Sequence, residues 1–147
     1  MIEIERKFLV KSNDFKEEAT CNFKIKQGYL NRDPERTVRI RMSGEKAYIT
    51  IKGKSSEDGT SRFEWEKEIN TNDAEKLLEL CSGALIEKIR YEVNFSDHKF
   101  VVDDFFGSQK GLILAEIELS SPDEAFDKPS WLGEEVTGIT KYYNASM

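Results

Sequence analysis

The sequence predicts a mainly β domain of the α+β class, built from eight antiparallel strands with a few helices packed outside them. Eight segments alternate apolar and polar side chains with a period of two, the pattern of a strand whose two faces differ. Turn-forming residues separate several of these segments, which favours pairing between consecutive strands. A chain of 147 residues fits one domain, 1–147, with a sizeable core.

The eight candidate strands are separated by turns such as Ser43-Gly44-Glu45 and Ser56-Glu57-Asp58-Gly59. They cover Ile2–Val10, Phe23–Asn31, Thr37–Ser43, Ala47–Lys54, Arg62–Ile69, Ile86–Phe95, Lys99–Phe106 and Leu112–Ser120.

Two helices are predicted from capping residues, and a third from a weaker pattern at 13–19. Asn72 and Glu75 form an N-cap signature, and Gly83 supplies a stop. A second, short helix is expected to start at 121–124, where Ser and Pro precede two acids. Helical spacing in the first helix aligns one apolar face, made of Ala74, Leu77, Leu78 and Cys81.

Overall charge argues against polymeric or membrane partners. The net charge is −6 and the pI about 5.0, so no domain-wide basic surface is available for a nucleic-acid polymer or an anionic membrane. The longest stretch without a charge, Leu80–Ile86, is too short to span a bilayer. Charges at the N-terminus interrupt any secretory signal, so a cytoplasmic location is expected. No feature of the sequence points to a particular oligomeric state.

The cysteines and the histidine suggest no metal centre of their own. Cys21 and Cys81 lack zinc-ligand spacing, and we expect both to be reduced packing residues. His98 is the only histidine, which removes the usual base of catalytic triads, and no site role is expected for it.

Within the predicted strands, one face is apolar and the other charged. Acidic pairs come from the first, fifth and eighth strands, and basic pairs from the third and sixth. The charged face carries Glu3, Glu5, Lys7, Arg39, Arg41, Lys52, Glu64, Glu66, Lys88, Arg90, Asp103, Glu116 and Glu118. The opposite face carries Ile4, Phe8, Val38, Ile40, Ile49, Ile51, Phe63, Trp65, Ile89, Tyr91, Val102, Ile117 and Leu119.

Two interpretations of the charged face remain open from the residues alone. It could simply face water on one side of a sheet. If the strands instead closed into a barrel with helices over the apolar face, the charges would line its interior. An enclosed site with both signs of charge suits a polyphosphate, because Arg and Lys bind phosphate oxygens while carboxylates hold bridging divalent cations.

The order of these residues resembles a known family, the triphosphate tunnel metalloenzymes of the CYTH superfamily. Glu3-Ile4-Glu5-Arg6-Lys7 matches the family's N-terminal E-x-E-x-K signature, and the other charged residues follow in the family's order over nearly the whole chain. The chain resembles a short, single-domain member of bacterial type. The resemblance implies a closed eight-stranded antiparallel barrel whose tunnel binds a triphosphate with Mg²⁺ or Mn²⁺.

By this resemblance, the basic residues would bind phosphate oxygens: Lys7, Arg39, Arg41, Lys52, Lys88 and Arg90. The acidic residues would hold the metal or activate water: Glu3, Glu5, Glu64, Glu66, Asp103, Glu116 and Glu118. Lys88 is one candidate proton acceptor, because its neighbour Arg90 disfavours the ammonium form. Glu5 and Glu64 are equal candidates.

The leading functional hypothesis is metal-dependent hydrolysis of inorganic tripolyphosphate, with nucleoside triphosphates as further small-molecule substrates. The alternatives are a class IV adenylyl cyclase, a thiamine triphosphatase, and a polyphosphate-binding sensor without turnover. Four aromatic residues either stack on a nucleobase at a tunnel mouth or pack on the barrel rim: Tyr29, Trp131, Tyr142 and Tyr143.

Overall fold

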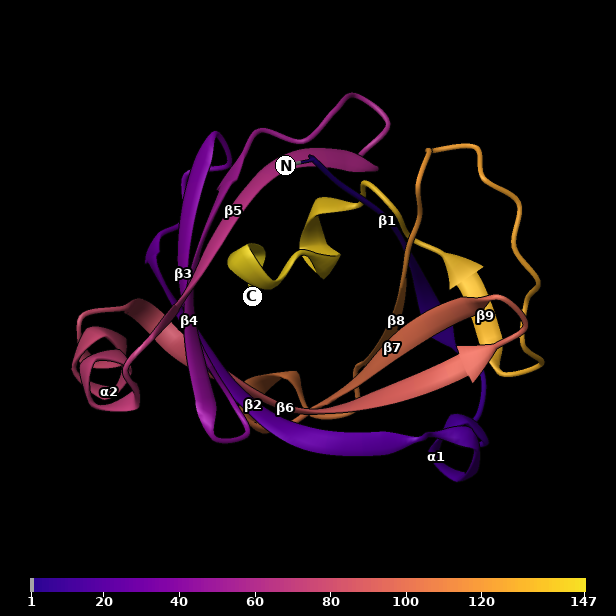
Figure 1. The fold of residues 1–147 in the computed structure, drawn as a ribbon, viewed down its shortest axis with the longest axis horizontal. Coiled ribbons are helices and arrows are strands. Elements are labelled where there is room, and N and C mark those ends of the chain that lie inside the picture. The colour runs from indigo at the N-terminus through magenta and orange to yellow at the C-terminus, as the bar shows by residue number, and fades with distance from the viewer. Residues whose placement is uncertain (1) are drawn as a thin grey trace.

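The computed structural model describes residues 2–147 and shows a closed antiparallel β-barrel (Figure 1). The strands are β1 (Ile2–Val10), β2 (Cys21–Asn31), β3 (Arg36–Ser43), β4 (Lys46–Gly53), β5 (Ser61–Ile69), β6 (Ser82–Phe95), β7 (His98–Phe105), β8 (Ile113–Glu118) and β9 (Leu132–Glu135). The first eight confirm the strands expected from the alternation, with bounds that differ by a few residues.

Strand β1 closes the barrel by pairing along both of its edges. Its first residues, Ile2–Ile4, pair with β5, and Glu5–Leu9 pair with β8 on the other edge. The ring therefore runs β1-β5-β4-β3-β2-β6-β7-β8 and returns to β1. The sequence did not predict the short β9. It pairs with β1 at Phe8 and Val10, farther along β1 than the residues that pair with β5.

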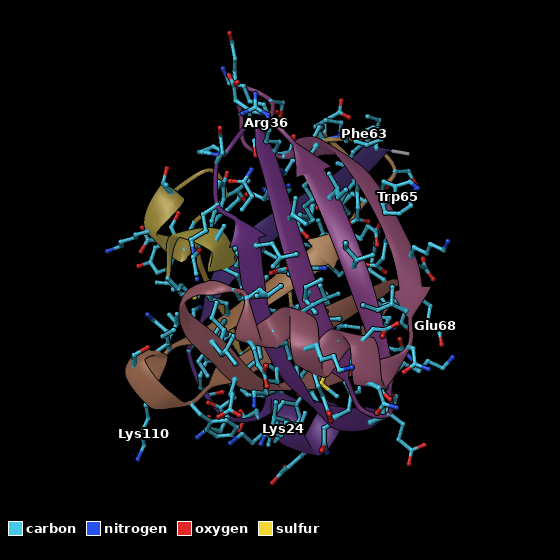
Figure 2. The ribbon with its side chains drawn as sticks, turned by 90° about the vertical axis from the view of Figure 1, so that its left-hand side faces the viewer. Lys24, Arg36, Phe63, Trp65, Glu68 and Lys110 are labelled. Atoms are coloured by element: carbon cyan, nitrogen blue, oxygen red, sulfur yellow. The ribbon has the colours of Figure 1, made fainter. Side chains whose placement is uncertain are left out.

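Two α-helices lie outside the barrel, as expected: α1 (Phe15–Glu18) and α2 (Thr71–Glu79). Helix α2 crosses the strands in Figure 2, and its buried Ala74 and Leu78 pack with Ile40 and Ala47. Its N-cap is Asn70, whose side chain accepts a hydrogen bond from the Asn72 backbone at 2.8 Å. The observed cap thus lies two residues before the predicted cap, Asn72.

The helix predicted at 121–124 is wrong. This stretch forms a turn and then an irregular segment that leads to β9. The Glu124 carboxylate accepts a hydrogen bond from the Ser120 backbone at 2.6 Å, but no apolar periodicity follows to hold a helix against the barrel. Single aromatic side chains anchor the segment instead: Phe126 packs edge-on against Phe8 and Phe100.

The outer core corrects several expectations about individual residues. Trp131 is fully buried against Phe15 and Phe100, so it cannot stack on a nucleobase. Cys21 is exposed rather than packed. Cys81 is partly buried, and both thiols are free.

No helix among residues 2–147 has the length and apolar character needed to cross a membrane.

A second apolar cluster lies inside one end of the barrel. Tyr29, Ile86, Phe105 and Leu114 are buried there with Val136. The C-terminal tail, defined here as Thr140–Met147, packs on this cluster and contains two short 3-10 helices, Thr140–Tyr142 and Asn144–Ser146. Figure 1 shows the tail, in yellow, within the ring of strands. These two 3-10 helices, which the sequence did not predict, therefore lie inside the ring, while the two α-helices lie outside it as expected.

The outer face is not covered all round. On β5, Phe63 and Trp65 are 48% and 36% exposed, and both point away from the barrel in Figure 2. Helix α2 covers β2, β3 and β4 instead.

Candidate active site

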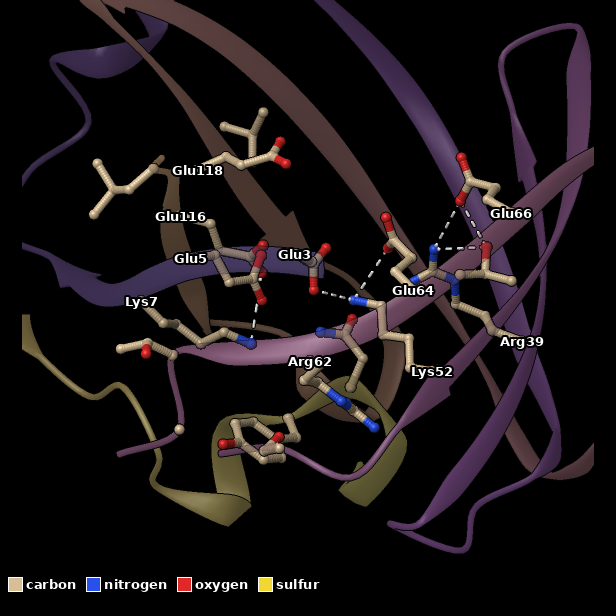
Figure 3. A pocket seen from close by; sticks show the side chains of 18 of the residues that line it. Glu3, Glu5, Lys7, Arg39, Lys52, Arg62, Glu64, Glu66, Glu116 and Glu118 are labelled. Atoms are coloured by element: carbon tan, nitrogen blue, oxygen red, sulfur yellow. Dashed lines mark hydrogen bonds and ion pairs between the residues drawn. The ribbon is translucent and has the colours of Figure 1, made fainter. Parts of the chain in front are cut away.

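The barrel encloses a cavity of about 780 Å³ (Figure 3). Every charged residue predicted for the site lines it except Asp103. The tail contributes Tyr143, Asn144 and Ala145 to its wall. His98 and Glu124 also line the cavity, and their side chains interact at 2.6 Å. The charged face predicted from the alternation is thus the inner face, which decides between the two interpretations of the sequence.

Strand register places opposite charges directly across from each other. Lys7 of β1 faces Glu116 of β8, and their charged atoms lie 3.5 Å apart. Lys52 of β4 faces Glu64 of β5, also at 3.5 Å. Because directly opposed residues in an antiparallel pair have neighbouring side chains, these contacts follow from the pairing itself.

Lys52 links two carboxylates from different strands. Its Nζ donates to Glu3 Oε1 at 2.7 Å, in addition to its contact with Glu64. Burial raises the pKa of Glu3, and the charge of Lys52 opposes this effect. Figure 3 shows the lysine between the two acids. A cation is therefore already placed where carboxylates from β1 and β5 meet.

Glu5 and Glu116 form a buried pair of carboxyl groups. Burial, followed by the charge of Glu116, raises the pKa of Glu5 to about 8. Burial would also raise the pKa of Glu116, but Lys7, Arg90 and a hydrogen bond with Glu5 outweigh it and lower that pKa. At neutral pH the pair thus carries one proton, held mainly by Glu5.

Asp103 lies behind the cations and does not line the cavity. Arg90 donates to both of its carboxylate oxygens, at 2.8 and 2.9 Å, and Lys88 Nζ lies 2.8 Å from Oδ2. Burial opposes ionisation of Asp103, but the charges of Arg90 and Lys88 lower its pKa. Its position suits the orientation of these two side chains better than direct binding of a metal.

Lys88 is completely buried, and burial lowers its pKa to about 7. Arg90 and Arg41 lower this pKa further, while Asp103 opposes the change. A substantial fraction of Lys88 is therefore neutral near physiological pH. Burial, Arg39 and Arg90 also lower the pKa of Arg41, to about 9, so an excess of positive charge gathers in this part of the site.

Arg39 belongs to a row across three strands. Its Nη2 donates to Thr50 Oγ1 at 3.1 Å, and Thr50 donates to Glu66 at 2.6 Å. The Arg39 Nε is buried and has no hydrogen-bond partner within residues 2–147. Glu66 is more exposed, with 41% of its side chain accessible, so it lies at the rim.

Several residues of the site carry no charge that would mark them in the sequence. Gln27 lies two residues before Tyr29 on the inner face of β2 and accepts a hydrogen bond from Arg41 Nε at 2.7 Å. The period-two pattern could have placed Gln27, but it lacks a charge to mark it. His98, expected to have no site role, lies at the cavity wall. Nothing local in the sequence signals that Asn144 would return to the barrel interior.

No three His, Cys, Asp or Glu side chains of the described chain are gathered closely enough to hold a metal ion in this arrangement. Three of the carboxylates on the cavity wall, Glu3, Glu64 and Glu116, instead lie against lysines, and Glu5 holds a proton.

Comparisons with known proteins find one family over nearly the whole chain. The CYTH domain model matches residues 1–146. The chain is 42% identical over 146 residues to an inorganic triphosphatase of Acetivibrio thermocellus, covering 99% of this chain and 92% of that protein. It is 37% identical over 151 residues to an inorganic triphosphatase of Nitrosomonas europaea, covering 100% of this chain and 97% of that protein.

A solved structure of an inorganic triphosphatase superposes with a TM-score of 0.70 at 34% identity, covering 98% of this chain and 95% of that chain. A Pyrococcus horikoshii protein, 22% identical with a TM-score of 0.66, shares the fold over 82% of this chain and 80% of its own. Given the family model's match from end to end and the charged barrel interior, the chain belongs to the CYTH domain family.

Proposed function

We propose that this protein hydrolyses inorganic triphosphate, releasing orthophosphate and pyrophosphate. The observation that carries the proposal is the enclosed cavity, in which six basic side chains face a set of carboxylates. The names of the similar proteins, inorganic triphosphatases at 42% and 37% identity, support the same substrate. Nucleoside triphosphates would be secondary substrates.

The basic residues would bind the phosphate chain through charge-assisted hydrogen bonds. Arg39 offers its Nε donor, which has no partner among residues 2–147, and Lys52 can exchange Glu3 for a phosphate oxygen. The remaining donors come from β1, β3 and β6: Lys7, Arg41, Lys88 and Arg90.

The donor set fits a divalent cation such as Mg²⁺ or Mn²⁺, which prefers oxygen ligands. Burial, and then the charge of Glu116, keep a proton on Glu5 at neutral pH, and a cation could neutralise the pair in place of that proton. The residues that would hold it are Glu3, Glu5, Glu64, Glu116 and Glu118. When bound, the metal would offset charge on the phosphate oxygens.

Lys88 is the best supported of the three candidate bases. Its pKa of about 7 allows it to accept a proton from an attacking water at neutral pH. Glu5 is a weaker candidate, because its pKa of about 8 keeps it protonated in the metal-free site. Glu64 is paired with Lys52.

A substrate screen tests the proposal. Purified protein is incubated with tripolyphosphate, ATP, GTP or thiamine triphosphate, each with Mg²⁺ or Mn²⁺, and phosphate, pyrophosphate and cyclic AMP are quantified. We expect the highest kcat/KM for tripolyphosphate. Cyclic AMP with pyrophosphate from ATP would show a cyclase instead, and fastest turnover of thiamine triphosphate a thiamine triphosphatase. Tight tripolyphosphate binding without turnover under either metal would identify a sensor.

A further inference from the structure

The C-terminal tail contacts the proposed phosphate-binding side chains directly. The backbone carbonyl of Tyr142 accepts a hydrogen bond from Lys7 Nζ at 3.2 Å. Arg32 fixes the far end of the tail by donating to the carbonyls of Ala145 at 2.8 Å and Met147 at 3.1 Å. The segment between these contacts is therefore held firmly, and Asn144 lies within it.

Asn144 Oδ1 accepts two hydrogen bonds at 2.9 Å, one from Lys88 Nζ and one from Gln27 Nε2. The direction of this network follows from chemistry. The Arg41 guanidinium can only donate, so the oxygen of Gln27 must face it and the Gln27 amide nitrogen must point the other way. A protonated Lys88 also only donates, so the oxygen of Asn144 must face both partners.

Asn144 and Asp103 together fix the Lys88 amino group. Lys88 is completely buried, and its Nζ contacts Asp103 on one side and Asn144 on another. These contacts use two of the three hydrogen-bonding positions on Nζ. The third is left to face the cavity that Lys88 lines. If Asn144 were removed, Asp103 alone would hold the amino group, which could then rotate about that contact.

We propose that Asn144 is a positioning residue that fixes Lys88 Nζ and, through Gln27, the Arg41 guanidinium for reaction with the triphosphate. This role rests on the proposed function, because it assumes that Lys88 and Arg41 act on the substrate. The C-terminal tail would then orient side chains of the site in addition to packing inside the barrel.

Three variants test the role. Asn144→Ala removes the acceptor, and Asn144→Ser keeps a neutral acceptor oxygen on a shorter side chain. Ser146→Ala is the matched control, since Ser146 is an exposed residue of the same tail. For each variant we would measure kcat and KM with tripolyphosphate, the Kd for metal-free tripolyphosphate by calorimetry, and the melting temperature.

We expect Asn144→Ala to lower kcat by about 10- to 100-fold, the cost of a misplaced reacting group, at a nearly unchanged melting temperature. Its Kd should rise several-fold because Arg41 loses its support. Asn144→Ser should recover part of the lost kcat, and Ser146→Ala should match the wild type. Wild-type kcat and Kd in Asn144→Ala, or a lower kcat in Asn144→Ser than in Asn144→Ala, would overturn the proposal.

The failure of the proposed function gives a different result. A wild-type protein that binds tripolyphosphate without hydrolysing it would refute the triphosphatase, while the Kd values of Asn144→Ala and Ser146→Ala would still decide whether Asn144 supports the binding residues. Equal Kd values in these two variants would then refute the positioning role alone.

Discussion

Lys52 shows at the scale of one residue how opposite charges in the cavity are balanced. It contacts both Glu3 and Glu64, and only 14% of its side chain is exposed. Partly buried ion pairs of this kind contribute little net stability, because the cost of removing two charges from water offsets their attraction. We therefore expect Lys52 to contribute little to the stability of the fold.

We expect Lys52→Ala to weaken tripolyphosphate binding by about tenfold or more, the value of a hydrogen bond to a charged group. The free energy of unfolding should change little, since the pKa of Glu3 is already raised and Glu3 can take up a proton. Calorimetric titration and urea unfolding measure the two quantities. Lys67→Ala, an exposed lysine of β5, is the control. A large loss of stability with unchanged affinity would assign Lys52 a structural role.

Glu5 should make the stability of the metal-free protein depend on pH. Its pKa is about 8 in the folded state against a usual value of 4.5, so between these values the folded chain binds a proton that the unfolded chain has lost. The free energy of unfolding should therefore fall as pH rises through this window. Urea unfolding between pH 5 and pH 7, with a chelator present, should show a flatter dependence for Glu5→Gln than for the wild type. Parallel curves would contradict the raised pKa.

Among the elements, the strands were predictable and their packing partners were not. Period-two alternation is a local property, so it located β1 to β8 within a few residues. The helix expected at 121–124 failed because capping residues favour a helix start but supply no apolar face to stabilise it. Strand β9 is four residues long and depends on pairing with β1, which no local pattern reveals.

Trp131, just before β9, should fix this segment to the outside of the barrel. It is fully buried, and its indole Nε1 has no hydrogen-bond partner within the described residues. We expect Trp131→Ala to reduce the free energy of unfolding by about 3–5 kcal/mol, as for other large aromatic truncations. Trp131→Phe should cost much less, because it keeps most of the apolar contact and removes an unpaired donor. Urea unfolding distinguishes them, and equal losses would contradict this account.

At the scale of the whole molecule, barrel closure concentrates charges that repel one another when no ligand is bound. Arg39 and Arg90 both lower the pKa of Arg41, and Glu116 raises that of Glu5. A ligand that binds only the folded state, and that engages both sets of charges, should therefore stabilise the fold.

Tripolyphosphate with Mg²⁺ should raise the free energy of unfolding by about 2.7 kcal/mol at a free ligand concentration 100 times its Kd. Either component alone should do less, and phosphate or sulfate at matched ionic strength should have small effects, since general screening by salt does not depend on the geometry of the anion. Thermal melts with the three anions, with and without Mg²⁺, measure this. Equal shifts for all three would argue against an enclosed triphosphate site.

The sequence by itself determined which charged residues share a face, because side-chain direction alternates strictly along a strand. It could not determine that this face is the inside. That depends on the pairing of β1 with both β5 and β8, which joins residues from opposite ends of the chain. Tertiary structure also decided that Asp103 supports Arg90 and Lys88, and that Asn144 reaches Lys88 across 56 positions of sequence. Such contacts arise from barrel closure and tail packing, and neither leaves a periodic signal in the chain.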